Sequence, residues 1–343
     1  MMDTKHWNLT NTDKTYSKQA MQEAAELLKN GYTVAFPTET VYGLGADATN
    51  EAAVAGIFQA KGRPQDNPLI AHVANKQQLI QLVMELSPYV ENLIDAFTPG
   101  PLTFVLPSNG TCARNVTAGL STIAVRIPDH PVAQQLLTNC AIPIAAPSAN
   151  ISGKPSPTVA GHVWNDLNGR IAGILDGGPT GVGLESTVID CTQEIPVILR
   201  PGGVTKEQLE EVVGTVMMDP ALADQKEQPK SPGMKYTHYS PEVPLWLVDG
   251  SAQGIQEMIN QEQKRGLRIG ILASVKTARV LKADEIIPLG ETMREIAANL
   301  YEALRTFKQG EVDIIICEAF PEEGIGQAVM NRLKKAASTH LTL

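Results

Sequence analysis

The stretch Thr33-Val34-Ala35-Phe36-Pro37-Thr38-Glu39-Thr40-Val41-Tyr42-Gly43-Leu44-Gly45 predicts a short strand followed by a polar turn. The segments on either side of it indicate the rest of the fold. The residues from Thr33 to Phe36 are apolar or β-branched, which is typical of a buried strand. Pro37 cannot donate to a sheet, so the strand is expected to end there. Thr38 to Gly45 is then predicted as a turn.

Helical patterns flank this strand on both sides. From Ser17 to Asn30 apolar residues recur at helical spacing, with Ser17 as the predicted N-cap and Gly31 as the stop. A second helix is predicted to begin after Asn50 and to end where Gly62 and Pro64 break it. A helix, a strand and a helix in succession indicate a sheet that is covered by helices.

The first two thirds of the chain contain six further apolar segments that predict strands, separated by helical patterns and by Pro and Gly turns. These segments are Leu69 to Val73, Leu102 to Leu106, Thr122 to Ile127, Ile142 to Ala146, Ser186 to Asp190 and Val197 to Arg200. The pattern predicts an α/β domain, residues 1–214, with a twisted mixed sheet flanked by helices.

A proline-rich segment separates this domain from a second one. Thr205 and Gln208 form a predicted capping box for a helix ending near Gly214, and residues 215–242, with four prolines, are predicted as a linker. Residues 243–343 predict a smaller Rossmann-like domain with a parallel sheet, because strands and helices alternate regularly. The strands are Leu245 to Val248, Leu267 to Leu272 and Val312 to Cys317, and the helices lie near Ala252 to Arg265, Met293 to Lys308 and Gly326 to Ala337.

The composition excludes several classes of protein. No apolar run approaches the roughly 20 residues of a membrane-spanning helix, and residues 1–9 lack the apolar stretch of a secretory signal, so we expect a cytoplasmic protein. The four cysteines are far apart, which argues against a zinc site or a disulfide framework. Residues 1–205 carry 12 Lys and Arg against 17 Asp and Glu, and residues 206–343 carry 16 against 20. Neither half has the basic excess of a non-specific nucleic-acid binder, although a local basic groove is compatible with these totals.

Polar residues suited to chemistry concentrate at the ends of the predicted strands and helices of the first domain. The sequence has no Gly-x-x-x-x-Gly-Lys-Ser/Thr loop, no Gly-x-Gly-x-x-Gly after a strand and no Gly-x-Ser-x-Gly elbow. Lys61 and Arg63 lie at a predicted helix end, where they either neutralise the helix C-terminus or bind an anionic ligand. Ser148 and Asn150 follow an apolar strand on a tight turn, where both are also ordinary turn formers.

Three further residues lie in or at the end of apolar strands. Arg126 shares a strand face with Thr122 and must pair with an internal carboxylate or with a ligand carboxylate or phosphate. His72 is either a hydrogen-bonded core residue or a catalyst. Arg200 precedes Pro201-Gly202-Gly203, where the backbone can approach a ligand closely. Cations and hydroxyls without a convincing nucleophile and base favour chemistry in which the substrate supplies its own nucleophile.

In combination these segments closely resemble the threonylcarbamoyl-AMP synthases, the YrdC-like family, in its longer two-domain form. The resemblance covers nearly the whole chain, and the Lys-x-Arg and Ser-x-Asn signatures in this order, together with the linker segment, are highly specific. The matching stretches are Phe36 to Gly45, Lys61 to Pro64, Asn67 to Ile70, Ala146 to Asn150, Glu185 to Val188, Leu199 to Gly202 and Ser231 to Tyr239.

The resemblance implies an enzyme in which L-threonine and bicarbonate give N-carboxythreonine, whose carboxylate attacks the α-phosphorus of ATP and expels pyrophosphate. The product, threonylcarbamoyl-AMP, would serve the formation of threonylcarbamoyladenosine next to the anticodon of tRNAs. Magnesium is expected on the ATP phosphates, held by substrate oxygens and water, with no metal site built from protein residues. Proteins that transfer the threonylcarbamoyl group to tRNA are expected as partners, while direct tRNA binding stays open.

The resemblance also assigns the site residues. The catalytic signature would be Lys61, Arg63, Ser148 and Asn150. ATP or the adenylate would be held by Lys61, Arg63, Asn67, Thr122, Ser148, Ser156, Arg200 and Tyr236. The threonyl part would be surrounded by Thr38, His72, Arg126, Ala146 and Ser186, with Arg126 on its carboxylate. In the two-domain members the linker folds back over the active-site opening, so Tyr236 would reach the nucleotide and exclude water.

Two other functions stay open at this point. The first domain could be an RNA-binding module without catalysis, although the acidic totals and the few aromatic residues speak against it. The other is carbamoyl-adenylate chemistry on another acceptor, as in hydrogenase maturation, whose proteins contain a related domain but also the zinc-finger cysteine pairs that this sequence lacks. The second domain has no residue set assignable to chemistry, so regulation, partner docking and stabilisation all remain open for it.

Overall fold

The computed structural model describes residues 2–10, 14–222 and 239–343, and the chain separates into two compact units. The first unit comprises Met1–Ser152, Ser156–Gly181 and Glu185–Lys235, and the second comprises Gly153–Pro155, Val182–Leu184 and Tyr236–Leu343. The domain limits 1–214, 215–242 and 243–343 stay a prediction, because residues 223–238 of the linker lie outside the described part of the chain.

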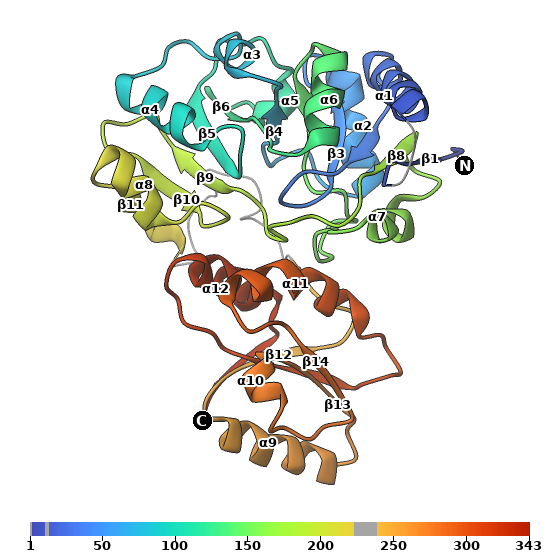
Figure 1. The fold of residues 1–343 in the computed structure, drawn as a ribbon, viewed down its shortest axis with the longest axis vertical. Coiled ribbons are helices and arrows are strands. Elements are labelled where there is room, and N and C mark those ends of the chain that lie inside the picture. The colour runs from blue at the N-terminus through green and yellow to red at the C-terminus, as the bar shows by residue number, and fades with distance from the viewer. Residues whose placement is uncertain (1, 11–13, 223–238) are drawn as a thin grey trace. The chain divides into compact units, whose positions relative to one another are not determined.

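A sheet of eleven strands forms the centre of the first unit (Figure 1). In chain order the strands are β1 (Lys5–Asn8), β2 (Val34–Phe36), β3 (Gly43–Asp47), β4 (Ile70–His72), β5 (Leu102–Pro107), β6 (Thr122–Arg126), β7 (Ile144–Ala145), β8 (Gly173–Asp176), β9 (Thr187–Asp190), β10 (Val197–Arg200) and β11 (Met217–Met218). Across the sheet they run in the order β1-β8-β2-β3-β7-β4-β6-β5-β9-β10-β11. β6 pairs parallel with β4 and antiparallel with β5, which confirms the predicted mixed sheet.

Helices cover both faces of this sheet. They are α1 (Lys14–Lys29), α2 (Glu51–Lys61), α3 (Lys76–Ile80), α4 (Pro88–Phe97), α5 (Arg114–Thr117), α6 (Pro131–Cys140), α7 (Ala160–Leu167) and α8 (Lys206–Val213), with a short 3-10 helix at Pro220–Leu222. One apolar cluster joins α2 and α4 to Ala35 of β2, and another joins α1 and α6 to Val34 and Phe36 of the same strand. Successive strand residues point to opposite faces, so the two clusters lie on opposite sides of the sheet. The helices α1 and α6 pack side by side.

Local signals explain how α2 delivers its last residue, Lys61, to the sheet. The Asn50 side chain accepts hydrogen bonds from the backbone N–H groups of Ala52 and Ala53, which satisfies donors that the first helical turn leaves free. At the other end Gly62 adopts φ +62°, a left-handed conformation that glycine adopts without strain. The predicted start and stop of this helix are confirmed.

Four features of the first unit differ from expectation, and one of them is that Met217–Met218, inside the predicted linker 215–242, forms β11 beside β10. Gly43–Asp47 forms β3, with Gly43 opposite Phe36 of β2, so the turn predicted to end at Gly45 ends at Tyr42. A Cβ at Gly45 would lie 2.8 Å from the Ile144 side chain, so close packing explains a glycine inside a strand. Ser17 is not an N-cap, because α1 already includes Lys14. The edge pair β1 and β8 was missed, because the four residues of β1 are mostly exposed and polar.

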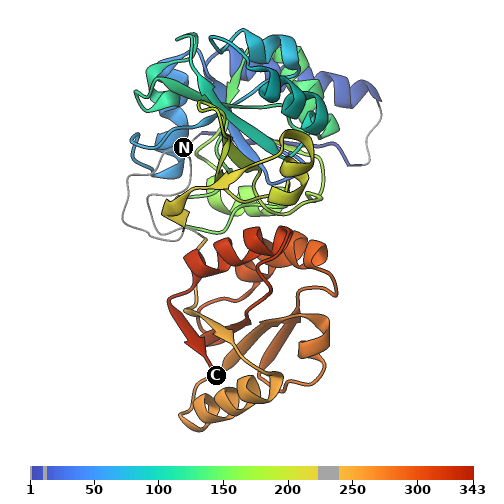
Figure 2. The same ribbon diagram turned by 90° about the vertical axis from the view of Figure 1, so that its left-hand side faces the viewer.

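The second unit has a sheet of five parallel strands between two helical layers. Its strands are β12 (Leu245–Asp249), β13 (Ile269–Ala273), β14 (Glu285–Pro288), β15 (Ile314–Glu318) and β16 (Thr339–Thr342), in the order β14-β13-β15-β12-β16. Its helices are α9 (Ala252–Lys264), α10 (Val275–Ala278), α11 (Met293–Thr306) and α12 (Ile325–Ala336). Figure 2 shows α9 and α10 on one side of this sheet and α11 and α12 on the other. The predicted Rossmann-like layers are confirmed, while β14, which is only partly buried, and the polar strand β16 were not predicted. Among the described residues no helix has both the length and the apolar character needed to cross a bilayer.

Candidate active site

The strand directions bring three of the predicted threonine-binding residues, His72, Arg126 and Ser186, to one edge of the first sheet. β4 and β6 run parallel and end at His72 and Arg126, which are register partners. β5 runs antiparallel to β6, so Thr103 near its start also pairs with Arg126. β9 runs parallel to β5, so Ser186, the residue before β9, reaches the same edge. We refer to this set of strand ends as the Arg126 edge.

The signature residues lie at the opposite ends of the same strands. β7 runs antiparallel to β4, so the turn with Ser148 and Asn150 leaves β7 beside the residues that precede β4, among them Asn67. Thr122, at the start of β6, lies at this end as well. We refer to it as the Lys61 edge. From Thr122 to Arg126 the strand covers about 13 Å at 3.3 Å per residue. The face between the two edges is formed by a small apolar cluster that includes Ile70, Val105 and Ala124.

Lys61 joins the two predicted signatures. Lys61 is 2% exposed. Its ammonium donates to the main-chain oxygens of Ser148 and Asn150, the latter at 2.6 Å. The Ser148 hydroxyl donates to Oδ1 of Asn150 at 2.5 Å. A buried ammonium that is held by main-chain oxygens keeps its charge at a fixed position, which suits the binding of phosphate oxygens. Lys61 therefore contacts the turn after β7 as well as ending α2, and its role toward a ligand stays a prediction.

Arg63 and Asn67 follow in the loop after α2. Arg63 is half-buried, and its guanidinium carbon lies 6.0 Å from the centre of the Phe58 ring. Asn67 is 1% exposed, yet neither atom of its side-chain amide has a hydrogen-bond partner among the described residues. A buried amide without partners costs free energy, so Asn67 is a candidate contact for a polar ligand.

Arg126 is buried and held by contacts from separate elements. It is 3% exposed, its Nε donates to the Gly100 carbonyl at 3.3 Å and its Nη1 donates to Oγ1 of Thr40 at 2.9 Å. Its Nη2 lies 2.7 Å from Oε1 of Glu39. The internal ion pair considered from the sequence is therefore present. Thr40 also contacts Thr38, whose hydroxyl lies 2.8 Å away and donates to the Val41 carbonyl, so Thr38 reaches Arg126 through one intervening residue.

His72 is a buried, neutral imidazole. Burial, with a smaller contribution from the Arg126 charge, lowers its pKa to about 3. Its Nδ1 lies 3.2 Å from the Ile70 carbonyl. At neutral pH the ring therefore adds no charge beside Arg126. Ala146, whose N–H donates to the same Ile70 carbonyl at 2.9 Å, is buried next to this strand.

Ser186 and Arg200 form one hydrogen-bonded group. Nε and Nη2 of Arg200 donate to the Ser186 carbonyl at 3.1 and 2.9 Å, and the Ser186 hydroxyl lies 2.7 Å from that of Thr103. Arg200, which the resemblance assigns to ATP, has these contacts at the Arg126 edge, and its assignment stays a prediction. Gly202 packs on the chain itself rather than opening space for a ligand, because a Cβ there would lie 2.3 Å from the Thr187 nitrogen.

The remaining predicted residues are dispersed. Thr122 is half-buried at the start of β6, and Ser156 is 1% exposed and donates to Oε1 of Glu185 at 2.5 Å. Tyr236 lies outside the described residues. Sequence reasoning missed Thr40 and Thr103. Thr40 lies in a stretch that was quoted for the resemblance, so its position offered a signal, whereas a threonine in an apolar strand such as Thr103 offers none.

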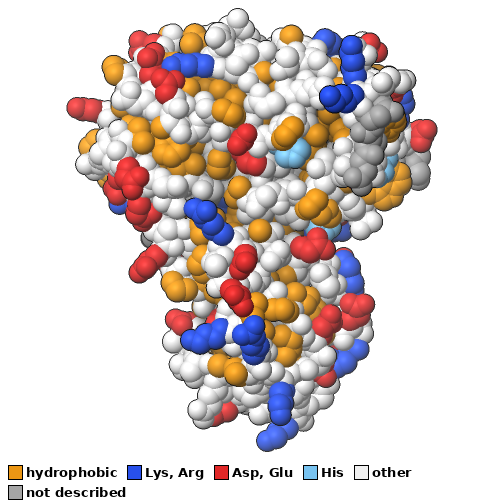
Figure 3. Space-filling model, in the orientation of Figure 1, with side chains coloured by type: hydrophobic (Ala, Val, Ile, Leu, Met, Phe, Trp, Pro, Cys, Tyr) orange, Lys and Arg blue, Asp and Glu red, His pale blue; other side chains and the backbone are white. Residues whose placement is uncertain are grey.

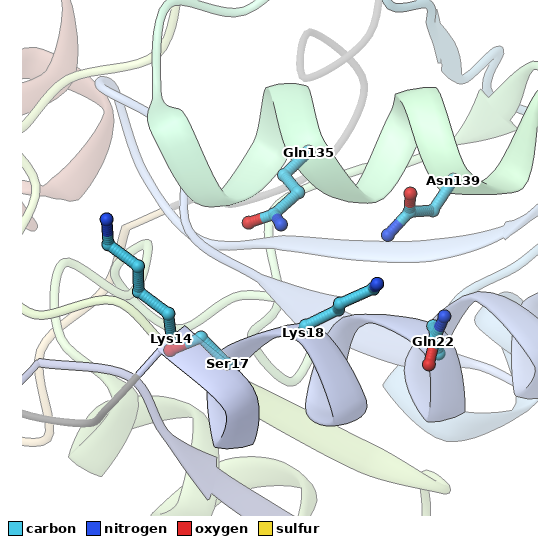
Figure 4. Close-up of a pocket in the computed structure, with 6 residues that line it drawn as sticks. All are labelled: Lys14, Ser17, Lys18, Gln22, Gln135 and Asn139. Atoms are coloured by element: carbon cyan, nitrogen blue, oxygen red, sulfur yellow. The ribbon is translucent and has the colours of Figure 1, made fainter.

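Other parts of the surface offer less chemistry. The pocket in Figure 4, of about 440 Å³, lies between α1 and α6, is lined by Lys14, Ser17, Lys18, Gln22, Gln135 and Asn139, and contains no predicted site residue. The four cysteines are buried and free of disulfides, and burial raises the pKa of Cys112 and Cys140 to about 12. On the face shown in Figure 3, acidic and basic side chains are interspersed rather than gathered into one basic area.

Known proteins match this chain along nearly its whole length. The Sua5/YciO/YrdC family model, described as telomere recombination, matches residues 26–202, and the model described as threonylcarbamoyl-AMP synthase, C-terminal domain, matches residues 204–338. A relative from Bacillus subtilis (strain 168), named threonylcarbamoyl-AMP synthase, is 52% identical over 340 residues, 98% of each chain. One from Pyrococcus abyssi (strain GE5 / Orsay), with the same name, is 49% identical over 92% of this chain and 93% of its own. The solved structure of P. abyssi Sua5 complexed with L-threonine has a TM-score of 0.94, 45% identity, and coverage of 99% of this chain and 100% of that one.

Buried cations and hydroxyls on the edges of a mixed sheet, together with these relatives, define an enzyme of the nucleotidyl-transferring class, which forms an AMP-linked intermediate. The chain belongs to the threonylcarbamoyl-AMP synthase family, as the resemblance of its motifs implied.

Proposed function

We propose that this protein joins L-threonine, bicarbonate and ATP into threonylcarbamoyl-AMP and pyrophosphate, for the formation of threonylcarbamoyladenosine next to the anticodon of tRNAs. One observation carries the proposal: the buried ammonium of Lys61 is held by main-chain oxygens of Ser148 and Asn150, which unites two distant signatures in one cluster. Relatives that carry the name of this activity at about half identity support it, as does a solved relative in complex with L-threonine.

Each sheet edge takes one substrate in this proposal. The threonyl part binds at the Arg126 edge among Thr38, His72, Arg126 and Ser186, and it extends toward Ala146, whose N–H donates to Ile70 at the start of β4. The triphosphate binds at the Lys61 edge, where Lys61, Arg63, Asn67, Thr122 and Ser148 supply donors. The small apolar face between the edges lets the carbamate formed on threonine reach the α-phosphorus along the strand direction. Ser156, Arg200 and Tyr236 complete the nucleotide set as assigned from the family resemblance.

Positioning and charge stabilisation are the main tasks of the side chains. The nucleophile is the carboxylate of N-carboxythreonine, which is already an anion, so the protein need not deprotonate it. Lys61 and Arg63 offset the charge that develops on the phosphates as pyrophosphate leaves. The neutral ring of His72 orients the substrate through hydrogen bonds and does not act as a base at neutral pH.

Magnesium enters with ATP as part of the substrate. The described residues contain no group of three or more His, Cys, Asp or Glu side chains able to hold an ion, whereas amides, hydroxyls and cations line the Lys61 edge. Such donors suit phosphate oxygens, so the residues fit an ion that stays on the phosphates. When bound there, magnesium neutralises phosphate charge and helps pyrophosphate to leave.

The expected surroundings follow from the reaction. A mixed anhydride of this kind is easily hydrolysed, so proteins that transfer the threonylcarbamoyl group to tRNA are the proposed partners. Because ATP and tRNA meet in the cytoplasm, we place the enzyme there.

Purified protein provides the test. Mass spectrometry should detect threonylcarbamoyl-AMP, and pyrophosphate release should require both L-threonine and bicarbonate. Pyrophosphate release that is independent of either one would contradict the proposal, and an RNA-binding module would release none.

A further inference from the structure

Glu39 has no role in the proposed mechanism, yet its carboxylate lies at the Arg126 edge. Oε1 of Glu39 lies 2.7 Å from Nη2 of Arg126, and the two side chains are 13% and 4% exposed. Glu39 comes from the loop between β2 and β3, and Arg126 ends β6. A buried pair of opposite charges therefore lies where the threonyl part is proposed to bind.

The atoms of Glu39 and Arg126 are close enough for an ion pair, but the angles between them do not meet the geometry of a hydrogen bond. Neither carboxylate oxygen of Glu39 has a hydrogen-bond partner among the described residues, and Nη2 of Arg126 has none either. In contrast, Nε and Nη1 of Arg126 donate to Gly100 and Thr40 in regular geometry. Buried donors and acceptors left unsatisfied cost free energy, so a ligand that supplies the missing partners gains affinity.

The nearby His130 does not pair with the negative charge of Glu39 in place of Arg126. His130 lies near enough for Glu39 to raise its pKa, but burial is the larger effect and lowers it. An imidazole with a lowered pKa is neutral at neutral pH, and Nδ1 of His130 accepts a hydrogen bond from the Val132 N–H. His130 therefore does not compete as a cation for Glu39.

We propose that Glu39 is a specificity-determining residue that accepts the α-ammonium group of L-threonine, while Arg126 takes its α-carboxylate. A free amino acid is a zwitterion, and one buried anion beside one buried cation offers the complementary charges. When the ligand enters between them, each ion exchanges its internal partner for a ligand group, so no uncompensated charge is buried. The inference rests on the proposed function in one respect, namely that threonine binds at the Arg126 edge.

A second ligand separates this role from a merely structural one. (R)-3-Hydroxybutanoate keeps the carboxylate and hydroxyl of L-threonine but lacks the amine. In Glu39→Gln, which keeps the size of the side chain and removes its charge, the Kd for L-threonine should rise at least tenfold. The Kd for 3-hydroxybutanoate should stay the same or fall, because Arg126 loses its internal competitor. Calorimetry without ATP measures the first ligand, and ligand-observed NMR measures the weaker second one.

Two results would overturn the inference. One is an unchanged Kd for L-threonine in Glu39→Gln. The other is an equal loss of both ligands, which would mean that Glu39 only positions Arg126. If 3-hydroxybutanoate binds too weakly to compare, L-threoninamide replaces it: it keeps the ammonium, so its binding should fall in Glu39→Gln and persist in Arg126→Gln, and the reverse would again overturn the inference.

Controls separate this inference from the proposed function. Glu39→Asp keeps the charge and should retain part of the threonine affinity, whereas Glu91→Gln, on an exposed position of α4, should change nothing. Thermal unfolding establishes that each variant is folded. If Arg126→Gln loses threonine while Glu39→Gln binds it normally, only the inference fails. If Arg126→Gln also binds threonine normally, the proposed threonine site fails with it.

Discussion

The ammonium of Lys61 lies 2.6 Å from the main-chain oxygen of Asn150, a residue 89 positions further along the chain. The contact fixes the end of α2 against the turn that follows β7. It thereby places a cation and the Ser148 hydroxyl in one cluster, although they come from separate elements.

Replacing Lys61 with Met should mainly impair the use of ATP. Met keeps the length of the side chain and loses its charge, so kcat/KM for ATP should fall by about 100-fold or more, the usual effect of removing one fixed donor to a reacting group. The carbonyls of Ser148 and Asn150 also lose a donor, so the free energy of unfolding should fall by about 1–3 kcal/mol. Pyrophosphate release and urea unfolding measure the two effects. Lys76→Met, at a pair with Asp95 on the surface, is the control and should change little. An unchanged ATP dependence would rule out a phosphate role for Lys61.

Asn67 should show opposite effects on stability and activity. Its buried amide has no partner among the described residues, so Asn67→Leu should leave the free energy of unfolding unchanged or raise it, while ATP binding weakens. Asn115 is the matched control, because it is also buried but donates to the Glu51 carbonyl at 2.9 Å. Asn115→Leu should lower the free energy of unfolding by about 1 kcal/mol and leave ATP binding intact. Loss of stability in Asn67→Leu with normal ATP binding would indicate a purely structural residue.

His72 should make stability depend on pH. Its pKa is lowered from 6.5 to about 3 in the folded protein, so between these values the unfolded chain binds a proton that the folded chain does not. The free energy of unfolding therefore has its full His72 contribution above pH 6.5 and falls as pH drops through this window. His72→Gln should flatten the dependence by up to one proton, as measured by urea unfolding across the window. Equal slopes in the wild type and His72→Gln would mean that His72 is not held neutral.

Gly202 should tolerate no side chain. A Cβ would lie 2.3 Å from the Thr187 nitrogen and 2.4 Å from the Ser186 carbonyl carbon, both backbone atoms. Gly202→Ala should lower the free energy of unfolding by about 1–3 kcal/mol and raise KM for threonine, because Ser186 and Arg200 must move apart. Gly161, in α7, has open space around it and is the control. If Gly202→Ala unfolds like the wild type, the backbone there is more adaptable than its packing indicates.

Local patterns made much of the fold predictable. Both helix caps are formed by residues that are neighbours in sequence, so the local sequence predicts them. They are the capping box of Thr205 and Gln208 and the cap of α2 at Asn50. β3 escaped prediction because Gly43 and Gly45 are poor strand formers, and only the packing of Gly45 against Ile144 explains them. Pairing of distant strands, as in β1 with β8, has no local signal.

The candidate site was predictable in its residue types but not in its connections. An arginine in an apolar strand predicts an anionic or hydrogen-bonding partner. Nothing near Arg126 in sequence, however, identifies Glu39 as that partner. Which edge a residue reaches depends on strand direction, so the contacts of Arg200 with Ser186 could not be predicted, and its assignment to the nucleotide stays a prediction. Tyr236 lies outside the described residues, so its assignment stays a prediction.

The groups that hold Lys61 belong to the polypeptide backbone, with one further contact to the Asn150 amide. Alanine scanning at positions 148 and 150 removes a hydroxyl and an amide but leaves these two carbonyls in place. A mutational survey will therefore understate what this turn contributes. The contribution of the two carbonyls to holding Lys61 can be measured by ester substitutions that weaken them as acceptors, or by insertions that redirect the chain.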